Sequence, residues 1–272
     1  MHPWESRTRA RRDVSLVRLP VAGLDVVVRT PTGSEDLLLL EAGPPGFGVA
    51  LAFLRRVVTR LDGEAIEWER IAVTDIDVLL LKLRQRVLGD RVRADLRCPA
   101  PGCHSRVDIA FSVEEYIDHH RPRPPARVRA AGEAGWFRLD ESDVEFRVPR
   151  AGDQVVIALE SRPELALRLR CIRPPEIAPS MRRRVEAAME AMAPSLCSEL
   201  HGTCPECGAL VSCLFDPLQY VLRELRDQAA FVHEDVCALA RTAHWSEAEI
   251  LALPTVRRVR YVELMHHEAA TF

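Results

Sequence analysis

Apolar residues follow two different spacings along this chain. In residues 74–90 they recur at every third or fourth position, which predicts one apolar face of a helix, and Gly89 is placed to end it. In residues 91–98 and 106–113 every second residue is apolar, which predicts two strands on either side of a tight loop. Together the patterns predict an α+β fold that is rich in helix.

The same two spacings predict the remaining elements. Two leucine-rich helices are expected on either side of the glycines and prolines of residues 43–48, the second of them running to about Gly63. A strand is expected at residues 24–30 and a hairpin at residues 136–149. Further helices are predicted in residues 153–171, in residues 179–194, where a methionine stripe is expected to be core, and in nearly all of the chain after Pro217.

These elements suggest three segments. Residues 1–70 are expected to hold an N-terminal arm and a helical segment, residues 71–216 a core that contains both cysteine loops described below, and residues 217–272 a helical region packed on that core.

Composition narrows the class of protein. With 272 residues, 47% of them hydrophobic, the chain is long enough to bury a core as a soluble globular protein. Its 37 basic and 40 acidic residues give a net charge of −3, so the molecule as a whole has no electrostatic attraction to nucleic acid or to an anionic membrane. The chain has no run of about 18 apolar residues and no apolar segment behind its basic start, so we expect a cytoplasmic protein with neither a membrane span nor a secretory signal.

Two short cysteine loops are the strongest chemical signal. Cys98 and Cys103 flank a Pro/Gly turn between the two predicted strands, and Cys204 and Cys207 form a C-x-x-C pair about a hundred residues later. A tight turn lets two nearby thiolates point at one ion, and four thiolates complete a tetrahedral site. The sequence therefore predicts one structural zinc ion bound by these four cysteines.

The residues that follow the two loops repeat with a constant offset of 104 positions. Because each loop is followed by alternating inward residues and an aromatic anchor, we expect a duplicated zinc-knuckle and β-hairpin unit that resembles a zinc ribbon. The matching pairs are Cys103 and Cys207, Val107 and Val211, Ile109 and Cys213, Phe111 and Phe215, and Tyr116 and Tyr220.

Other uses of the cysteines remain open, and catalysis has little support. The alternatives are two unrelated pairs or a reducible disulfide; a thioredoxin-like redox pair fits less well, because a strand rather than a helix follows the C-x-x-C motif. His233-Glu234 begins like a zinc-protease motif, but Cys237 stands where the second histidine belongs, and we expect no enzyme. The remaining cysteines, Cys171, Cys197, Cys213 and Cys237, are predicted to be small buried apolar residues.

The stretch from Asp235 to Met265 is the most distinctive. It predicts a helix, then Ser246 and Glu249 as a capping box that opens a short helix, then a further helix from Pro254. Arg257 and Arg258 are expected on the outer side of this last helix, and the whole is expected to be a compact helical hairpin.

This stretch also resembles the C-terminal signature of the T-even-type phage baseplate protein family, the hub subunits and assembly chaperones of contractile tails and related injection systems. With the paired cysteine loops and the preceding helix, the resemblance extends from about residue 70 to the end. Ala243 and Cys237 depart from it where tyrosine and histidine are usual, and the first cysteine loop has two extra residues. The matching residues are His244, Trp245, Ser246, Glu247, Glu249, Ile250, Leu251, Leu253, Pro254, Arg257, Arg258 and Tyr261.

The resemblance implies a non-catalytic part of a contractile tail or tail-like particle. It implies spike, hub and tube-initiating proteins as partners, no small-molecule substrate, and residence in the producing bacterium or in the particle. The expected partner contacts are Trp245, Glu249, Arg257, Arg258 and Tyr261. The alternative is a zinc-ribbon module that recognises nucleic acid or a transcription component, which the near-neutral charge disfavours.

Overall fold

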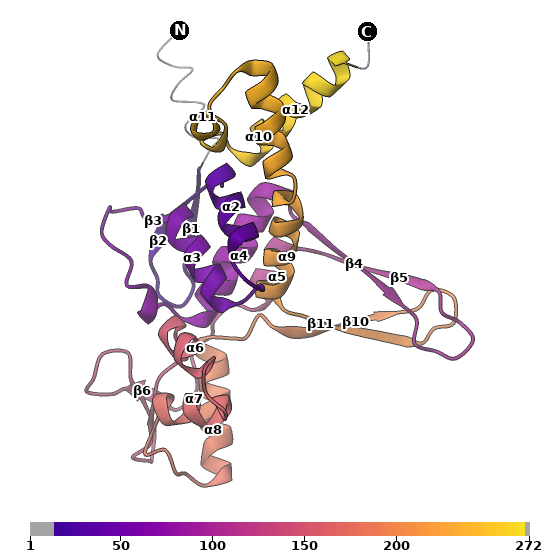
Figure 1. Cartoon of the computed structure of the whole chain (residues 1–272). Helices are drawn as coiled ribbons and strands as arrows, with labels where there is room; N and C mark the ends of the chain where they lie inside the picture. The colour runs from indigo at the N-terminus through magenta and orange to yellow at the C-terminus, as the bar shows by residue number, and fades with distance from the viewer. Residues whose placement is uncertain (1–13, 270–272) are drawn as a thin grey trace.

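The computed structural model describes residues 14–269, with side chains up to residue 265. It mixes helices with small antiparallel sheets, so the prediction of an α+β fold is confirmed. A helical body lies at the centre, two hairpins project from it as an arm, and the C-terminal helices lie at the end of the body opposite α6, α7 and α8 (Figure 1).

Caps in the sequence mark some of the helix ends. Thr32 and Glu35 form a capping box at the start of α2, and Gly89, with a φ of 90°, ends α4. Among the described helices, none is both long and apolar enough to cross a lipid bilayer. The helices are α2 (Gly33–Glu41), α3 (Phe47–Val57), the 3-10 helix η1 (Trp68–Arg70), α4 (Val73–Leu88), α5 (Val113–His119), α6 (Ala151–Ile157), α7 (Pro163–Cys171), α8 (Pro179–Met192), α9 (Pro217–Ala229), α10 (Val232–Ala243), α11 (Glu247–Leu251) and α12 (Thr255–Ala269).

The described strands form small antiparallel sheets. One sheet has the order β1-β2-β3, another has the order β6-β7-β8-β9, and β4-β5 and β10-β11 are separate hairpins. The strands are β1 (Val14–Arg18), β2 (Asp25–Arg29), β3 (Val58–Arg60), β4 (Arg91–Arg97), β5 (Arg106–Ser112), β6 (Val128–Ala130), β7 (Phe137–Leu139), β8 (Glu145–Phe146), β9 (Ile172–Arg173), β10 (Ser198–Thr203) and β11 (Leu210–Phe215).

The main core surrounds α4, in which Leu79, Leu80, Leu81 and Leu83 are at most 1% exposed. It contains residues from all three predicted segments, from Val17 through Leu80 to Leu225. Residues 14–29, expected to be part of an arm, form a hairpin that contributes to this core, and residues 1–13 of that arm lie outside the described residues. The second leucine-rich helix ends at Val57 rather than near Gly63, because the β-branched residues that follow pair as β3 with β2.

A second, smaller core lies between the β6–β9 sheet and the helices α7 and α8. Its buried residues include Leu139, Phe146 and Ile172 from the strands and Val185 and Ala188 from α8. The methionines Met181, Met189 and Met192 pack against it, so the prediction that their stripe is core is confirmed.

Candidate functional site

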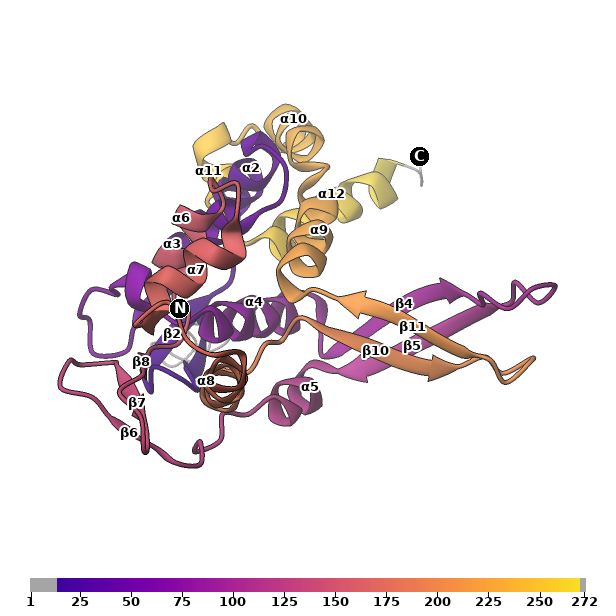
Figure 2. The same cartoon turned by 90° about the horizontal axis from the view of Figure 1, so that it is seen from below.

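The two predicted cysteine loops lie at the tips of two packed hairpins. The pairing of β4 with β5 runs from Arg97 and Arg106 at the tip toward the body of the protein. The pairing of β10 with β11 likewise runs from Thr203 and Leu210 at the tip toward the body. The hairpins pack against each other through β5 with β10 and β4 with β11, and together they form the arm that projects from the body (Figure 2). At Gly202 the two hairpins lie so close that a Cβ would already be in van der Waals contact, 3.4 Å, with the side chain of Ile109.

Backbone hydrogen bonds give both loops the same closure. The amide of Cys98 donates to Ser105, and the amide of Cys204 donates to Ala209, both at 2.9 Å. The second bond closes a loop that is two residues shorter, as the sequences require. Gly102 has a φ of 80° and Gly208 a φ of 75°, which is the left-handed conformation that glycine adopts without strain.

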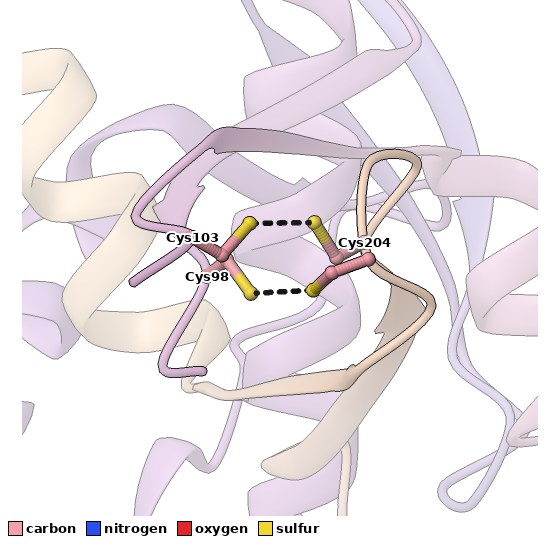
Figure 3. A group of neighbouring side chains, drawn as sticks. Cys98, Cys103 and Cys204 are labelled. Atoms are coloured by element: carbon pink, nitrogen blue, oxygen red, sulfur yellow. Dashed lines mark hydrogen bonds between the residues drawn. The ribbon is translucent and has the colours of Figure 1, made fainter. Parts of the chain in front are cut away.

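The four cysteine sulfurs converge on one point. Cys98 Sγ lies 3.5 Å from Cys207 Sγ, and Cys103 Sγ lies 3.8 Å from Cys204 Sγ (Figure 3). All four sulfurs lie within 4.8 Å of one another. A tetrahedral ion with bonds of about 2.3 Å to sulfur requires sulfurs roughly 3.8 Å apart, whereas a disulfide requires about 2.05 Å. The four cysteines are free and could together hold a metal ion.

The environment of the sulfurs is partly buried and unevenly polar. Cys98 and Cys204 are 1% and 2% exposed, and they pack with Val107 and Val211 in a small apolar cluster. Hydrogen bonds from the side chain and backbone of Ser105 lower the pKa of Cys103 to about 6. At Cys98 a hydrogen bond from the amide of Ala100 also lowers the pKa of the thiol. Burial and the neighbouring sulfurs outweigh this effect and raise the pKa to about 12. The site thus places one thiol that ionises readily, Cys103, beside one whose ionisation is opposed, Cys98.

Aromatic residues at equivalent positions meet where the arm joins the body. The rings of Phe111 and Phe215 contact each other edge to face at 5.1 Å. Tyr116 and Tyr220 each contact Phe215, at 5.2 Å and 5.3 Å between ring centroids. The two repeated pairs of aromatic residues therefore occupy one shared cluster at the base of the arm.

Outside the cluster, the prediction of buried cysteines is only partly right. Cys171 is 1% exposed, and burial raises the pKa of its thiol to about 12. Cys213 is half-buried, but Cys197 and Cys237 are exposed. Cys197 lies in the segment between α8 and β10, and Cys237 lies on the outer face of α10, positions that local sequence spacing does not reveal.

The C-terminal stretch has the predicted capping box. The Glu249 carboxylate accepts from the Ser246 hydroxyl at 2.7 Å, and the Ser246 hydroxyl accepts from the Glu249 amide at 3.3 Å. Trp245 is half-buried and contacts Tyr261 edge to face, with ring centroids 5.5 Å apart. Arg257 and Glu249 are exposed, so four of the five expected contact residues have part or all of their side chain at the surface.

Arg258 is the exception, and its predicted outer position is wrong. Its side chain is 0% exposed and pairs with Asp36 of α2 at 2.6 Å and with Asp235 of α10 at 2.9 Å. Arg258 follows the buried Thr255 by three residues on α12 and therefore shares its inward face. Sequence analysis missed both acids, because Asp36 is 222 residues away and no local spacing connects it with Arg258.

Among the described residues, no other group of histidine, cysteine or acidic side chains is close enough to hold a metal. Comparisons with known proteins return no relative: no protein-family model, no curated protein and no solved structure matches the chain.

Proposed function

We propose that this chain is a non-enzymatic component or assembly factor of the baseplate and hub of a contractile phage tail or a related injection system. The observation that carries the proposal is the sequence block from His244 to Tyr261, which matches the signature of that family. In support, this block packs through Arg258 on α2, while Arg257 is exposed and Trp245 is only partly buried.

The metal in this proposal is one structural zinc ion held by Cys98, Cys103, Cys204 and Cys207. The sulfur separations fit a tetrahedral thiolate site, the geometry that zinc prefers and that leaves no open position for water. When bound, the ion would keep all four sulfurs as thiolates and tie the two hairpins together. Its role is therefore to stabilise the arm rather than to catalyse a reaction.

A duplication explains why two segments so far apart make one metal site. Each segment would be a zinc knuckle, an outgoing strand and an aromatic anchor, at positions such as Phe111 and Phe215. The contact between these two rings and the matching closure of both loops support this interpretation.

The docking surface in this proposal lies on the C-terminal helices, which would act as a helical hairpin. Tryptophan and arginine are frequent at the centres of protein interfaces, and Trp245, Arg257 and Tyr261 supply both kinds of side chain. The contact with Tyr261 and the capping box hold Trp245 in one place, which reduces the entropy lost on binding. Arg258 takes no part in this surface and instead supports it from beneath.

The experiment is affinity purification of the tagged chain from a strain that assembles the particles. We expect hub, spike or tube-initiating proteins to copurify with the wild-type chain. Trp245→Ala combined with Arg257→Ala should abolish the copurification and leave the strain without complete particles. Arg241→Ala provides a matched control, because Arg241 is an exposed arginine on α10 that is not among the matching residues.

The variant must remain folded for the result to count. Its thermal melt should stay cooperative and its metal content unchanged, because Arg257 is exposed and Trp245 is only half-buried. A folded double variant that still copurifies with its partners and supports particle assembly would remove the docking role from these residues. Copurification of the wild-type chain with no tail component would contradict the assignment to baseplates.

One observation favours the alternative of a zinc-ribbon module that recognises nucleic acid. The outer face of the β4–β5 hairpin exposes Arg91, Arg93, Arg97 and Arg106. Asp95 and Asp108 lie among them, and Arg106 pairs with Asp95, so the patch is not strongly basic. Retention on DNA that weakens steeply with salt would support this alternative over the baseplate proposal.

A further inference from the structure

A groove on the surface between α4, α9 and α12 is lined by apolar side chains. Its volume is about 720 Å³, and Val87 and Leu88 at the end of α4 form one side of it. Phe231, Val256 and Val259 line the rest, with Phe231 65% and Val256 58% exposed. A contiguous apolar patch of this kind commonly marks a binding site.

The polar residues of the groove give it a negative charge. Glu224, Asp227 and Glu263 line it, against the single cation Arg260. Glu263 pairs with Arg260 at 3.0 Å, and Glu224 pairs with Arg84. Asp227 is exposed and has no ion pair among the described residues. An occupant with apolar and cationic side chains would complement this lining.

The described chain begins beside this groove. Val14 pairs with Arg29 at the end of the β1–β2 hairpin, and the Ser15 hydroxyl is bonded to Arg86 of α4 at 2.7 Å. Arg86 directly precedes Val87 of the groove. On the other side, the amide of Thr255, which also lines the groove, donates to the carbonyl of Pro31 at 3.2 Å.

The thirteen residues that precede Val14 have the composition that the groove requires. Their sequence, MHPWESRTRARRD, has four arginines against two acids and includes the large apolar side chains Met1 and Trp4. Thirteen residues can span roughly 40 Å when extended, and Ser15 is bonded to Arg86, the residue before Val87 of the groove, so the segment is long enough to reach it.

We propose that residues 1–13 bind in this groove of their own chain. Trp4 would cover the apolar side chains of Phe231 and Val259, and the arginines would pair with Asp227 and its acidic neighbours. Binding would bury an apolar stripe of α12 that otherwise faces water. Because the segment is joined to β1 by a short connection, its effective concentration at the groove exceeds that of a separate chain.

Limited digestion of the full-length protein with trypsin tests the proposal, because Arg7 and Arg9 are cleavage sites within the segment. The initial cleavage rate after each arginine is measured by mass spectrometry. Phe231→Ser combined with Asp227→Lys should increase both rates about tenfold, since cleavage follows the population of the released segment. Trp4→Ala should have a similar effect, and adding it to the groove variant should have no further effect.

Leu214→Ser is the matched control, because Leu214 is 72% exposed on β11 of the arm and outside the groove. It should cleave like the wild type, and all variants should keep a cooperative thermal melt and the wild-type metal content. Equal cleavage rates in the wild type and the groove variant would overturn the proposal. Protection that appears only at high protein concentration would also overturn it, because the occupant would then come from a second copy.

Discussion

The guanidinium of Arg258 lies 2.6 Å from the carboxylate of Asp36, although 222 residues separate them in sequence. Thr255 donates its hydroxyl to the same carboxylate at 2.9 Å, and Asp235 accepts from the other side of Arg258. Burial raises the pKa of Asp36 even though Arg258 acts against it. This buried network fixes α10 and α12 to α2, so it holds the C-terminal block in place.

Arg258→Met should destabilise the protein by about 3–5 kcal/mol, because it leaves two buried carboxylates without their cation. Urea unfolding measures the change. Arg257→Met is the control and should change stability by less than about 0.5 kcal/mol, since Arg257 is exposed. Adding Asp36→Asn and Asp235→Asn to Arg258→Met should recover part of the loss, and a full loss in that triple variant would contradict the ion-pair explanation.

Gly33→Ala should weaken the packing of α2 against Arg258 and α11. A Cβ on Gly33 would lie 2.8 Å from Arg258 Nη1 and 3.0 Å from the Cα of Leu251, so α11 would have to move. We expect a loss of about 1–3 kcal/mol in thermal or urea unfolding. Gly48→Ala, in α3 with no atom within 4 Å of its Cβ, should instead be neutral or slightly stabilising. Equal effects of the two changes would contradict this prediction.

Purified protein should contain one zinc ion per chain, measured by elemental analysis. Serine at any of the four ligand positions should lower the metal content and the melting temperature together, because a structural zinc site supplies on the order of 10 kcal/mol of apparent binding energy. Cys197→Ser should change neither, since Cys197 is exposed and outside the cluster. Protein prepared without chelators that contains almost no metal would refute the site.

Asp77 should make the protein less stable as the pH rises. Burial, with a smaller contribution from Asp216, raises its pKa from 3.8 to about 7. Between these two values the folded state binds more protons than the unfolded state, so stability falls from about pH 4 to pH 7 and the loss is complete above pH 7. Asp77→Asn should remove this fall and add on the order of 4 kcal/mol above pH 7.

Asp153 is the control for Asp77, because its pKa is shifted in the opposite direction. Burial acts to raise its pKa, but hydrogen bonds with Arg147, the amide of Arg150 and Arg170 prevail and lower it to about 2. Its contribution is therefore present above about pH 4 and lost as the pH falls toward 2. Asp153→Asn should lose stability at neutral pH, where Asp77→Asn gains it. Urea unfolding of both variants is measured between pH 4 and pH 8. A gain in stability from both variants at neutral pH would contradict the opposite pKa shifts of Asp77 and Asp153.

Most of the regular elements could be read from the sequence because their signals are local. The period of the apolar residues indicates which face of a helix or strand is buried. Gly89 ends α4 and the Ser246–Glu249 capping box begins α11, and both act through hydrogen bonds to nearby backbone groups. The cluster of four cysteines was also predictable, because residue type and a short turn suffice to present two thiols in each loop.

Only the tertiary structure decided which side of α12 faces inward, because the partners of Arg258 come from α2 and α10. The same holds for Cys197 and Cys237, whose residue type favours burial but whose positions expose them. The strands β1 and β3 form because β2 lies between them, a pairing that short alternating runs cannot specify on their own. Local spacing reflects the conformational preferences of neighbouring residues, whereas burial and ion pairing depend on segments that meet only after the chain has folded.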